Sequence, residues 1–192
     1  MSFRIELKTR LTASDLLIMK SDLSNNGMLK LYPSRLVKSI YYDTLDHSMY
    51  HNSEEGILPR KKIRIRSYGN SGIYRLEKKI SSYEGRFKTS SEIDFSSVSK
   101  CIYDKDYGVI KPILEVSYVR DYFSFQGLRL TFDNAIKYKY LRGYKRLTKY
   151  DFESVMEIKT GVDKSIDEIM MKVPNLRISR FSKYCRGLEF FI

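Results

Sequence analysis

The chain has 192 residues, 42% of them hydrophobic, so length and composition predict a single folded domain over residues 1–192 and exclude wholesale disorder. Lys and Arg number 35 against 23 acidic residues, and the net charge of +12 predicts a polyanionic partner: nucleic acid, anionic lipid or a phosphate chain.

The longest early apolar run, Leu16 to Met19, is too short for a signal or a membrane span, so we expect a soluble cytoplasmic protein without a membrane segment. Cys101 and Cys185 lack metal-ligand spacing and are expected to be reduced thiols.

The N-terminal segment predicts a strand followed by a helix. From Phe3 to Leu11, apolar and charged residues alternate with a period of two, as they do in a strand with one buried face. A helix is expected to begin near Thr12, where Asp15 supplies a partial capping box. Its apolar residues are Leu16, Leu17, Met19 and Leu23.

Two charged strands are expected in the middle of the chain. They run from Lys62 to Tyr68 and from Tyr74 to Ile80, and Gly69 to Gly72 forms the hairpin turn between them. A longer turn is expected from Ser81 to Arg86. The alternation places five charged residues on the polar faces of these strands: Arg64, Arg66, Arg75, Glu77 and Lys79.

The C-terminal half continues the pattern. Strands are expected over Val116 to Tyr122, Leu128 to Asp133 and Val155 to Lys159, and a helix with a capping box from Ser165 to Glu168 follows. The apolar face of this helix contains Ile166, Ile169, Met170 and Val173. The fold class is therefore mainly antiparallel β, of the α+β type, with a few packed helices.

The charged strand faces have two interpretations. They could form a solvated sheet face with cross-strand ion pairs. Alternatively they could line the inside of a closed barrel, with the apolar faces outward under the helices. Arg64, Arg66, Lys79, Arg120 and Arg129 would then share one lumen. Like charges about 4 Å apart cost roughly 4 kcal/mol at an effective dielectric of 20, so such a lumen would require bound anions. Linear phosphate chains fit a narrow tube better than a duplex does.

The chain lacks the sequence motifs of several other phosphate-binding and nucleic-acid-binding folds, which excludes those folds. The chain has no Gly-x-x-x-x-Gly-Lys-Ser/Thr loop, so it is not a P-loop protein. It has no helix-turn-helix or zinc-finger spacing, and we expect no DNA partner.

A set of short segments, in order along nearly the whole chain, resembles the VTC (vacuolar transporter chaperone) domain family. Each segment is weak alone, but together and in register they form a strong signal. The segments are Ser39-Ile40-Tyr41-Tyr42-Asp43-Thr44, Arg64-Ile65-Arg66-Ser67-Tyr68-Gly69, Glu77-Lys78-Lys79, Tyr118-Val119-Arg120, Arg129-Leu130-Thr131-Phe132-Asp133, Glu157-Ile158-Lys159 and Ser182-Lys183-Tyr184.

The resemblance implies the triphosphate tunnel fold of the CYTH superfamily, an antiparallel barrel of about eight strands. For the VTC branch it implies synthesis of polyphosphate from ATP with a divalent metal, manganese or magnesium. It assigns phosphate binding to Lys8, Arg64, Arg66, Lys79, Arg120 and Arg129, with further contacts from Lys88, Lys159, Arg180 and Lys183. Tyr118 and Ser182 would donate hydrogen bonds to phosphate oxygens, and Glu157 would bind the metal.

One departure from the superfamily bears on the reaction. The leading Glu-x-Glu-x-Lys segment is here Arg-x-Glu-x-Lys, with Arg4 in the first position. The loss of one carboxylate disfavours small-substrate triphosphatase or cyclase chemistry, while Glu6, Glu77 and Glu115 are open as metal or ion-pair partners. A triphosphatase and a polyphosphate-binding module without activity stay open as alternatives, and a membrane partner is possible.

Overall fold

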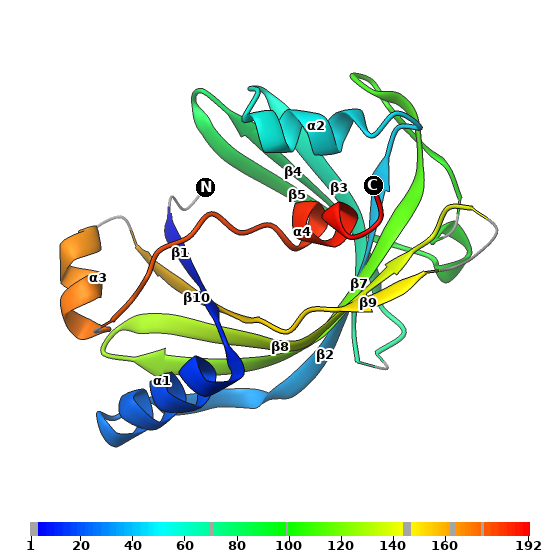
Figure 1. Ribbon diagram of the computed structural model, residues 1–192. Helices are drawn as coiled ribbons and strands as arrows, with labels where there is room; N and C mark the ends of the chain where they lie inside the picture. Colours follow the sequence, from blue (N-terminus) through cyan, green and yellow to red (C-terminus); the bar gives the residue numbers. More distant parts are fainter. Residues whose placement is uncertain (1–3, 70, 99, 144–146, 162–163, 174) are drawn as a thin grey trace. The chain divides into compact units, whose positions relative to one another are not determined.

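The computed structural model of the chain describes residues 4–69, 71–98, 100–143, 147–161, 164–173 and 175–192 (Figure 1). The strands are β1 (Arg4–Leu11), β2 (Leu29–Asp43), β3 (Arg60–Tyr68), β4 (Tyr74–Ser82), β5 (Gly85–Ile93), β6 (Ile102–Asp104), β7 (Gly108–Phe125), β8 (Leu128–Tyr140), β9 (Thr148–Tyr150) and β10 (Ser154–Gly161). The helices are α1 (Ala13–Asn25), α2 (Ser48–Glu55), α3 (Ile166–Lys172) and α4 (Lys183–Glu189), with one 3-10 turn at Phe95–Ser97.

The strand pairing confirms the expected mainly antiparallel architecture. In the described part of the chain the main path of the sheet has eight strands, in the order β1-β10-β8-β7-β2-β3-β4-β5, while β6 pairs with β7 and β9 with β8. The chain divides into two compact units that are interleaved in sequence, so β2, β7 and β8 each contribute residues to both. Whether residues 1–192 behave as one VTC-type domain stays a prediction.

The first unit comprises Met1–Arg35, Tyr118–Ile136 and Asp151–Phe181. In its core, the apolar faces of β1, β10 and β8 pack against one side of α1 and one side of α3. Met19 and Leu23 of α1 and Ile169 of α3 are buried there. This helical cover leaves the opposite, charged faces of these strands available for other contacts.

The second unit comprises Leu36–Ser117, Lys137–Tyr150 and Ser182–Ile192. Met49 of α2 packs with Ile63 and Ile65 on the apolar face of β3. Asp43, fully buried at the end of β2, accepts hydrogen bonds from the backbone N–H groups of Met49 (2.9 Å) and Tyr50 (3.1 Å), and from the hydroxyl of Tyr184 in α4. One carboxylate therefore fixes both α2 and α4.

Gly187 explains how closely α4 approaches the sheet in the second unit. A Cβ atom at this position would lie 2.5 Å from Tyr138 Cδ1 and 2.7 Å from Leu114 Cδ2. Any side chain would therefore push α4 away, and with it the residues at the start of that helix.

The sequence-based expectations are largely confirmed. Both capping boxes form, Thr12 with Asp15 and Ser165 with Glu168, and the strand from Phe3 is described from Arg4 onward. The turn expected at 81–86 is wrong in extent: Ser82 pairs with Gly85, so only two residues separate β4 from β5. Leu17, Ile166 and Met170 are exposed, because each helix buries a narrower stripe than its apolar residues suggest.

The cysteine and membrane expectations have partial outcomes. Cys101 and Cys185 are free thiols, exposed and buried respectively. Of the helices that the structure describes, none combines the length and the apolar character needed to cross a membrane.

Candidate functional site

The second unit gathers basic side chains on the face of its sheet opposite α2. The registers place Ser39 opposite Arg66 and Tyr41 opposite Arg64 in β2 and β3, and Glu77 of β4 opposite Arg64. Directly paired residues lie on the same face of a sheet. The alternation predicted for β3 and β4 therefore brings Arg64, Arg66, Glu77 and Lys79 together, as expected.

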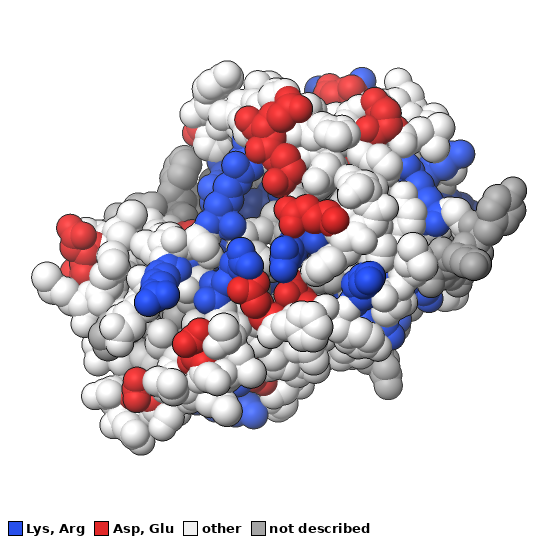
Figure 2. Space-filling view, viewed as in Figure 1, with Lys and Arg blue, Asp and Glu red and all other residues white. Residues whose placement is uncertain are grey.

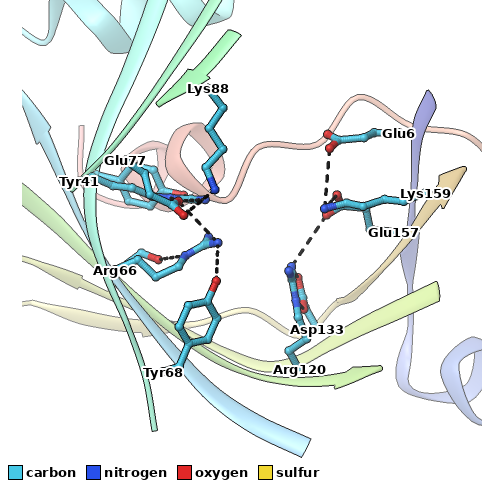
Figure 3. A network of polar contacts seen from close by, with 12 residues as sticks. Glu6, Tyr41, Arg66, Tyr68, Glu77, Lys88, Arg120, Asp133, Glu157 and Lys159 are labelled. Carbon is cyan, nitrogen blue, oxygen red and sulfur yellow. Dashed lines mark hydrogen bonds and ion pairs between the residues drawn. The ribbon is translucent and has the colours of Figure 1, made fainter. Parts of the chain in front are cut away.

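Glu77 lies at the centre of this arrangement, which we call the Glu77 cluster: Glu77, Arg64, Arg66 and Lys88 (Figure 3). Its Oε2 atom lies 2.6 Å from Arg64 Nη2 and 3.7 Å from Arg66 Nη1, and its Oε1 atom accepts a hydrogen bond from Lys88 Nζ at 2.6 Å. Burial would raise the pKa of Glu77, but the charges of Arg64 and Arg66 outweigh it and lower the pKa to about 2. Glu77 is therefore an ionised counter-charge that holds three cations in place.

Hydroxyl groups complete the positioning of the two arginines. Tyr41 accepts a hydrogen bond from Arg64 Nη1 at 2.9 Å, and Ser39 accepts one from Arg66 Nε at 3.2 Å. Burial opposes ionisation of Tyr41, yet the nearby charges of Arg64 and Arg66 leave its pKa below the ordinary value. The local potential is thus strongly positive although a carboxylate is present.

The lysines form a row that shares Lys88 with this cluster. Lys62, Lys79 and Lys88 lie opposite one another on β3, β4 and β5. Lys62 Nζ donates to Ser182 Oγ at 2.8 Å, and Ser182 caps α4 by accepting from the Cys185 backbone N–H. Ser182 therefore has a structural role beside its predicted phosphate contact, and Lys183 is the first residue of α4. Sequence reasoning missed Lys62, although it stands two residues before Arg64 in the same alternation.

The first unit contains a second charged group, which we call the Glu157 cluster: Glu6, Lys8, Glu157, Lys159, Arg120 and Asp133. Figure 3 labels all of these residues except Lys8. Glu157 Oε1 lies 2.9 Å from Lys159 Nζ, which is also 3.7 Å from Glu6 Oε1. Lys8 lies opposite Glu157 in the β1–β10 register, and its ammonium group donates to the Phe181 carbonyl at 3.1 Å. Burial opposes the charge of Glu157, but Lys159, Lys8 and Arg120 hold its pKa well below the usual range.

Arg120 is bound differently from the other predicted phosphate contacts. It donates from Nε and Nη2 to the two carboxylate oxygens of Asp133 at 2.5 and 2.6 Å, and Nη2 is also 3.8 Å from Glu157 Oε2. Asp133 is fully buried. The bidentate pair makes Arg120 a fixed part of the cluster, and Asp133 is a site residue to which sequence reasoning gave no role.

The remaining predicted residues lie in the first unit with less defined surroundings. Arg129 is exposed, opposite Lys159 in register, and its guanidinium lies 5.9 Å from the Tyr122 ring centroid. Tyr118 is buried under the guanidinium of Arg120, with 5.3 Å to the ring centroid. Arg180 is exposed. Their predicted contacts with phosphate, and the prediction that the five basic residues line one lumen, stay predictions.

The two clusters differ in charge. The Glu77 cluster has three cations and one carboxylate, whereas the Glu157 cluster has three cations and three carboxylates. Basic and acidic side chains are likewise intermixed on the face shown in Figure 2. An excess of positive charge suits an anion alone, while a balanced group suits an anion that arrives with a cation.

The fit of a divalent metal can be tested at Glu157. No group of three or more His, Cys, Asp or Glu side chains in the described ranges is arranged to hold a metal. Glu157 is nevertheless an ionised carboxylate, and beside it in register Thr131 Oγ1 is buried without a hydrogen-bond partner among the described residues. Magnesium typically takes one or two carboxylates and completes its shell with substrate phosphates and water. The residues therefore fit a metal that comes with phosphate, not one held by protein alone. Glu115, which the sequence left open as a metal or ion-pair partner, belongs to the second unit, whereas Glu157 belongs to the first.

Comparison with known families and structures gives a consistent result. The model of the VTC domain family matches residues 3–110 and 104–192. A comparison with curated protein sequences gives no match. Among solved structures, a candidate adenylate cyclase from Bacillus halodurans shares 15% identity at a TM-score of 0.67, over 100% of this chain and 98% of that one.

Two further solved structures share the fold. A candidate adenylyl cyclase from Hippeastrum, described as having a dominant triphosphatase activity, shares 18% identity at a TM-score of 0.62, over 99% of this chain and 97% of that one. A conserved hypothetical protein from Pyrococcus furiosus shares 15% identity at a TM-score of 0.60, over 95% and 99%. Together with the match to the VTC domain family, these similarities confirm the expected triphosphate tunnel fold.

Proposed function

Because the chain belongs to the VTC domain family, we propose that it is a metal-dependent polyphosphate polymerase, which transfers the γ-phosphate of ATP to a growing polyphosphate chain. The observation that carries the proposal is the Glu77 cluster with its neighbouring lysine row. Arg64, Arg66 and Lys88 surround one carboxylate, and Lys62 and Lys79 add two further cations. Such an excess of organised positive charge favours phosphate groups over neutral substrates.

In this proposal the side chains act by position and charge. A terminal oxygen of the polyphosphate chain attacks the γ-phosphorus of ATP, the bond from that phosphorus to the β–γ bridging oxygen breaks, and ADP leaves. Arg64 and Arg66, held by Glu77, Tyr41 and Ser39, would hold phosphate oxygens without having to reorganise. In-line transfer of this kind needs little covalent chemistry from the protein.

Glu157 is the residue that would hold a manganese or magnesium ion, with Thr131 beside it. Bound together with the phosphates, the ion supplies neutralisation of charge on the phosphate oxygens. Lys159 and Arg120 keep the Glu157 carboxylate ionised, so no proton has to leave before the ion binds.

A triphosphatase is the second candidate function. The fold is shared with the Hippeastrum protein that has a dominant triphosphatase activity, and water in place of the chain end would give this reaction at nearly the same site. Two features favour the polymerase: Arg4 replaces the leading carboxylate, and further basic residues, Lys159, Arg180 and Lys183, follow the arginine pair later in the chain. A binding module without activity is the third outcome.

The test uses the purified chain with ATP and manganese. We expect ADP together with long phosphate chains, detected on a gel with a phosphate-chain stain while free phosphate is assayed in parallel. Free phosphate without chains would make the protein a triphosphatase. Tight polyphosphate binding without either product would make it a binding module. We place the activity in the cytoplasm, where ATP is available and where two free cysteines are in keeping with a reducing environment.

A further inference from the structure

We propose that Lys62 is a further phosphate-binding residue, which with Lys79 and Lys88 forms a subsite for a phosphate group next to those at Arg64 and Arg66. The proposal rests on the proposed phosphate-chain function and deepens it. It assigns to this face of the second unit a linear chain of phosphates as its ligand, in preference to a single phosphate group.

The first argument is the register of the three lysines. Lys62 lies directly opposite Lys79, and Lys79 lies directly opposite Lys88, so the three lysines form one row of residues across β3, β4 and β5. Like charges directly opposite one another destabilise a sheet. Lys88 relieves part of this repulsion by reaching diagonally to Glu77. Bound phosphate oxygens would add further negative charge beside the row.

The second argument is how Lys62 is held. Its ammonium group donates to Ser182 Oγ at 2.8 Å and contacts Cys185 Sγ at 3.6 Å, and it lies 5.9 Å from the centroid of the Tyr184 ring. An ammonium group has three donors. The two acceptors found in the described residues leave one donor for a phosphate oxygen. Because α4 is itself fixed through Gly187 and Asp43, Lys62 is positioned before any ligand binds.

The third argument is spacing along β3. Lys62, Arg64 and Arg66 occupy alternate positions on one face of the strand. With a rise of about 3.4 Å per residue, the cations recur every ~7 Å and span ~14 Å. One phosphate cannot reach such a length, whereas a linear polyanion can follow it.

The experiment measures binding by calorimetry, without metal, for pyrophosphate, tripolyphosphate and a longer polyphosphate, each at several salt concentrations. The variant is Lys62→Met, with Lys62→Arg as the charge-conserving variant. Lys38→Met is the matched control: it removes the same charge from neighbouring β2, but Lys38 pairs with Ser67 and alternates with Ser39, so it lies on the other face.

We expect Lys62→Met to weaken binding of the longer chain about tenfold and that of pyrophosphate much less, because one charge-assisted hydrogen bond is lost. The slope of log K for polyphosphate binding against log salt concentration should decrease in magnitude by about one. A purely structural role of Lys62 would not change this slope. Lys62→Arg should recover most of the affinity, and Lys38→Met should behave as wild type. If Lys62→Met binds like wild type, or if Lys38→Met weakens binding equally, the subsite does not exist. If the wild-type protein binds no polyphosphate at all, the proposed function fails as well.

Discussion

Lys88 Nζ lies 2.6 Å from Glu77 Oε1, although the β4–β5 register sets Lys88 opposite Lys79. The lysine reaches diagonally across the strand pair to the carboxylate that also holds Arg64 and Arg66. Glu77 is therefore the counter-charge for cations from two neighbouring strands. Its replacement should affect both the stability of the second unit and the order of its phosphate-binding groups.

The first prediction concerns the pH dependence of stability. The pKa of Glu77 falls from 4.5 to about 2 in the folded protein, which corresponds to about 3 kcal/mol of stability. Because the folded pKa is lowered, this contribution is complete above pH 4.5 and is lost as the pH falls toward 2. In Glu77→Gln the free energy of unfolding should be lower than in wild type at pH 7 by about this amount, and the difference should disappear near pH 2.

Urea denaturation at several pH values measures this difference. Glu92→Gln is the matched control, because Glu92 lies exposed in β5 and is 3.9 Å from the exposed Arg75. Surface pairs of this kind contribute little, so this variant should unfold like wild type. A pH-independent gap between Glu77→Gln and wild type would contradict the assignment of the effect to this carboxylate.

The second prediction separates Arg120 from Arg129, which the sequence treats alike. Arg120 is held bidentately by the buried Asp133, whereas Arg129 is exposed. Lysine cannot reproduce a bidentate pair. We expect Arg120→Lys to lower the free energy of unfolding by about 3 kcal/mol and Arg129→Lys to change it by less than about 0.5 kcal/mol.

Tripolyphosphate binding, measured on the same two variants, completes the comparison. Arg129→Lys should bind tripolyphosphate more weakly than wild type while unfolding normally. Equal stability losses in both variants would show that the Arg120–Asp133 pair is not the anchor of the Glu157 cluster. Unchanged binding in Arg129→Lys would remove Arg129 from the phosphate site.

The sequence predicted the strands that have one apolar and one charged face. In β3, Ile63 and Ile65 alternate with Arg64 and Arg66, so both the strand and its polar face could be predicted. β5 was not predicted, because its side chains are polar and mostly exposed on both faces, which leaves no hydrophobic period to detect. β2 was not predicted either, since the exposed residues of its first half include several large hydrophobic ones in no alternating order.

The site was predictable to the extent that it depends on alternation. Which residues share a face follows from the period of two, and Lys62 could have been found in the same way. The pair Lys88–Glu77 could not, because Lys88 reaches diagonally across the β4–β5 register. The pair Arg120–Asp133 could not, because it joins two strands and depends on how they are paired. The link from Lys62 to Ser182 joins residues 120 positions apart in the chain and depends on the placement of α4.

The third prediction concerns Thr131. Its hydroxyl is buried without a partner in the part of the chain that the structure describes, and an unsatisfied buried hydroxyl costs about 1 kcal/mol or more. Thr131→Val keeps the shape and removes this cost, so the free energy of unfolding without ligand should rise by about 1 kcal/mol. If the hydroxyl helps to hold a metal with its phosphates, the same variant should bind manganese–tripolyphosphate more weakly. A loss of stability in Thr131→Val would show that the hydroxyl has a partner in solution.

The last prediction concerns Glu157 and uses two effects of opposite sign. In Glu157→Gln a carboxylate disappears beside Lys159, Lys8 and Arg120, so the Glu157 cluster becomes more positive. Metal-free tripolyphosphate should then bind as tightly as in wild type or more tightly, because the repulsion of the carboxylate is gone. Manganese should increase the affinity for tripolyphosphate in wild type but not in the variant, because the ligand for the ion is missing. The variant should also unfold more easily, by about 3 kcal/mol, since its cations lose a buried partner.

Glu6→Gln is the control that separates ligation from charge. It removes the same charge from the same cluster, where Glu6 Oε1 lies 3.7 Å from Lys159 Nζ. If Glu157 acts as a metal ligand, Glu6→Gln should keep the response to manganese, and only Glu157→Gln should lose it. If both variants lose the response equally, net charge governs metal binding and Glu157 has no special role. Calorimetric titration with and without manganese distinguishes these results without relying on turnover.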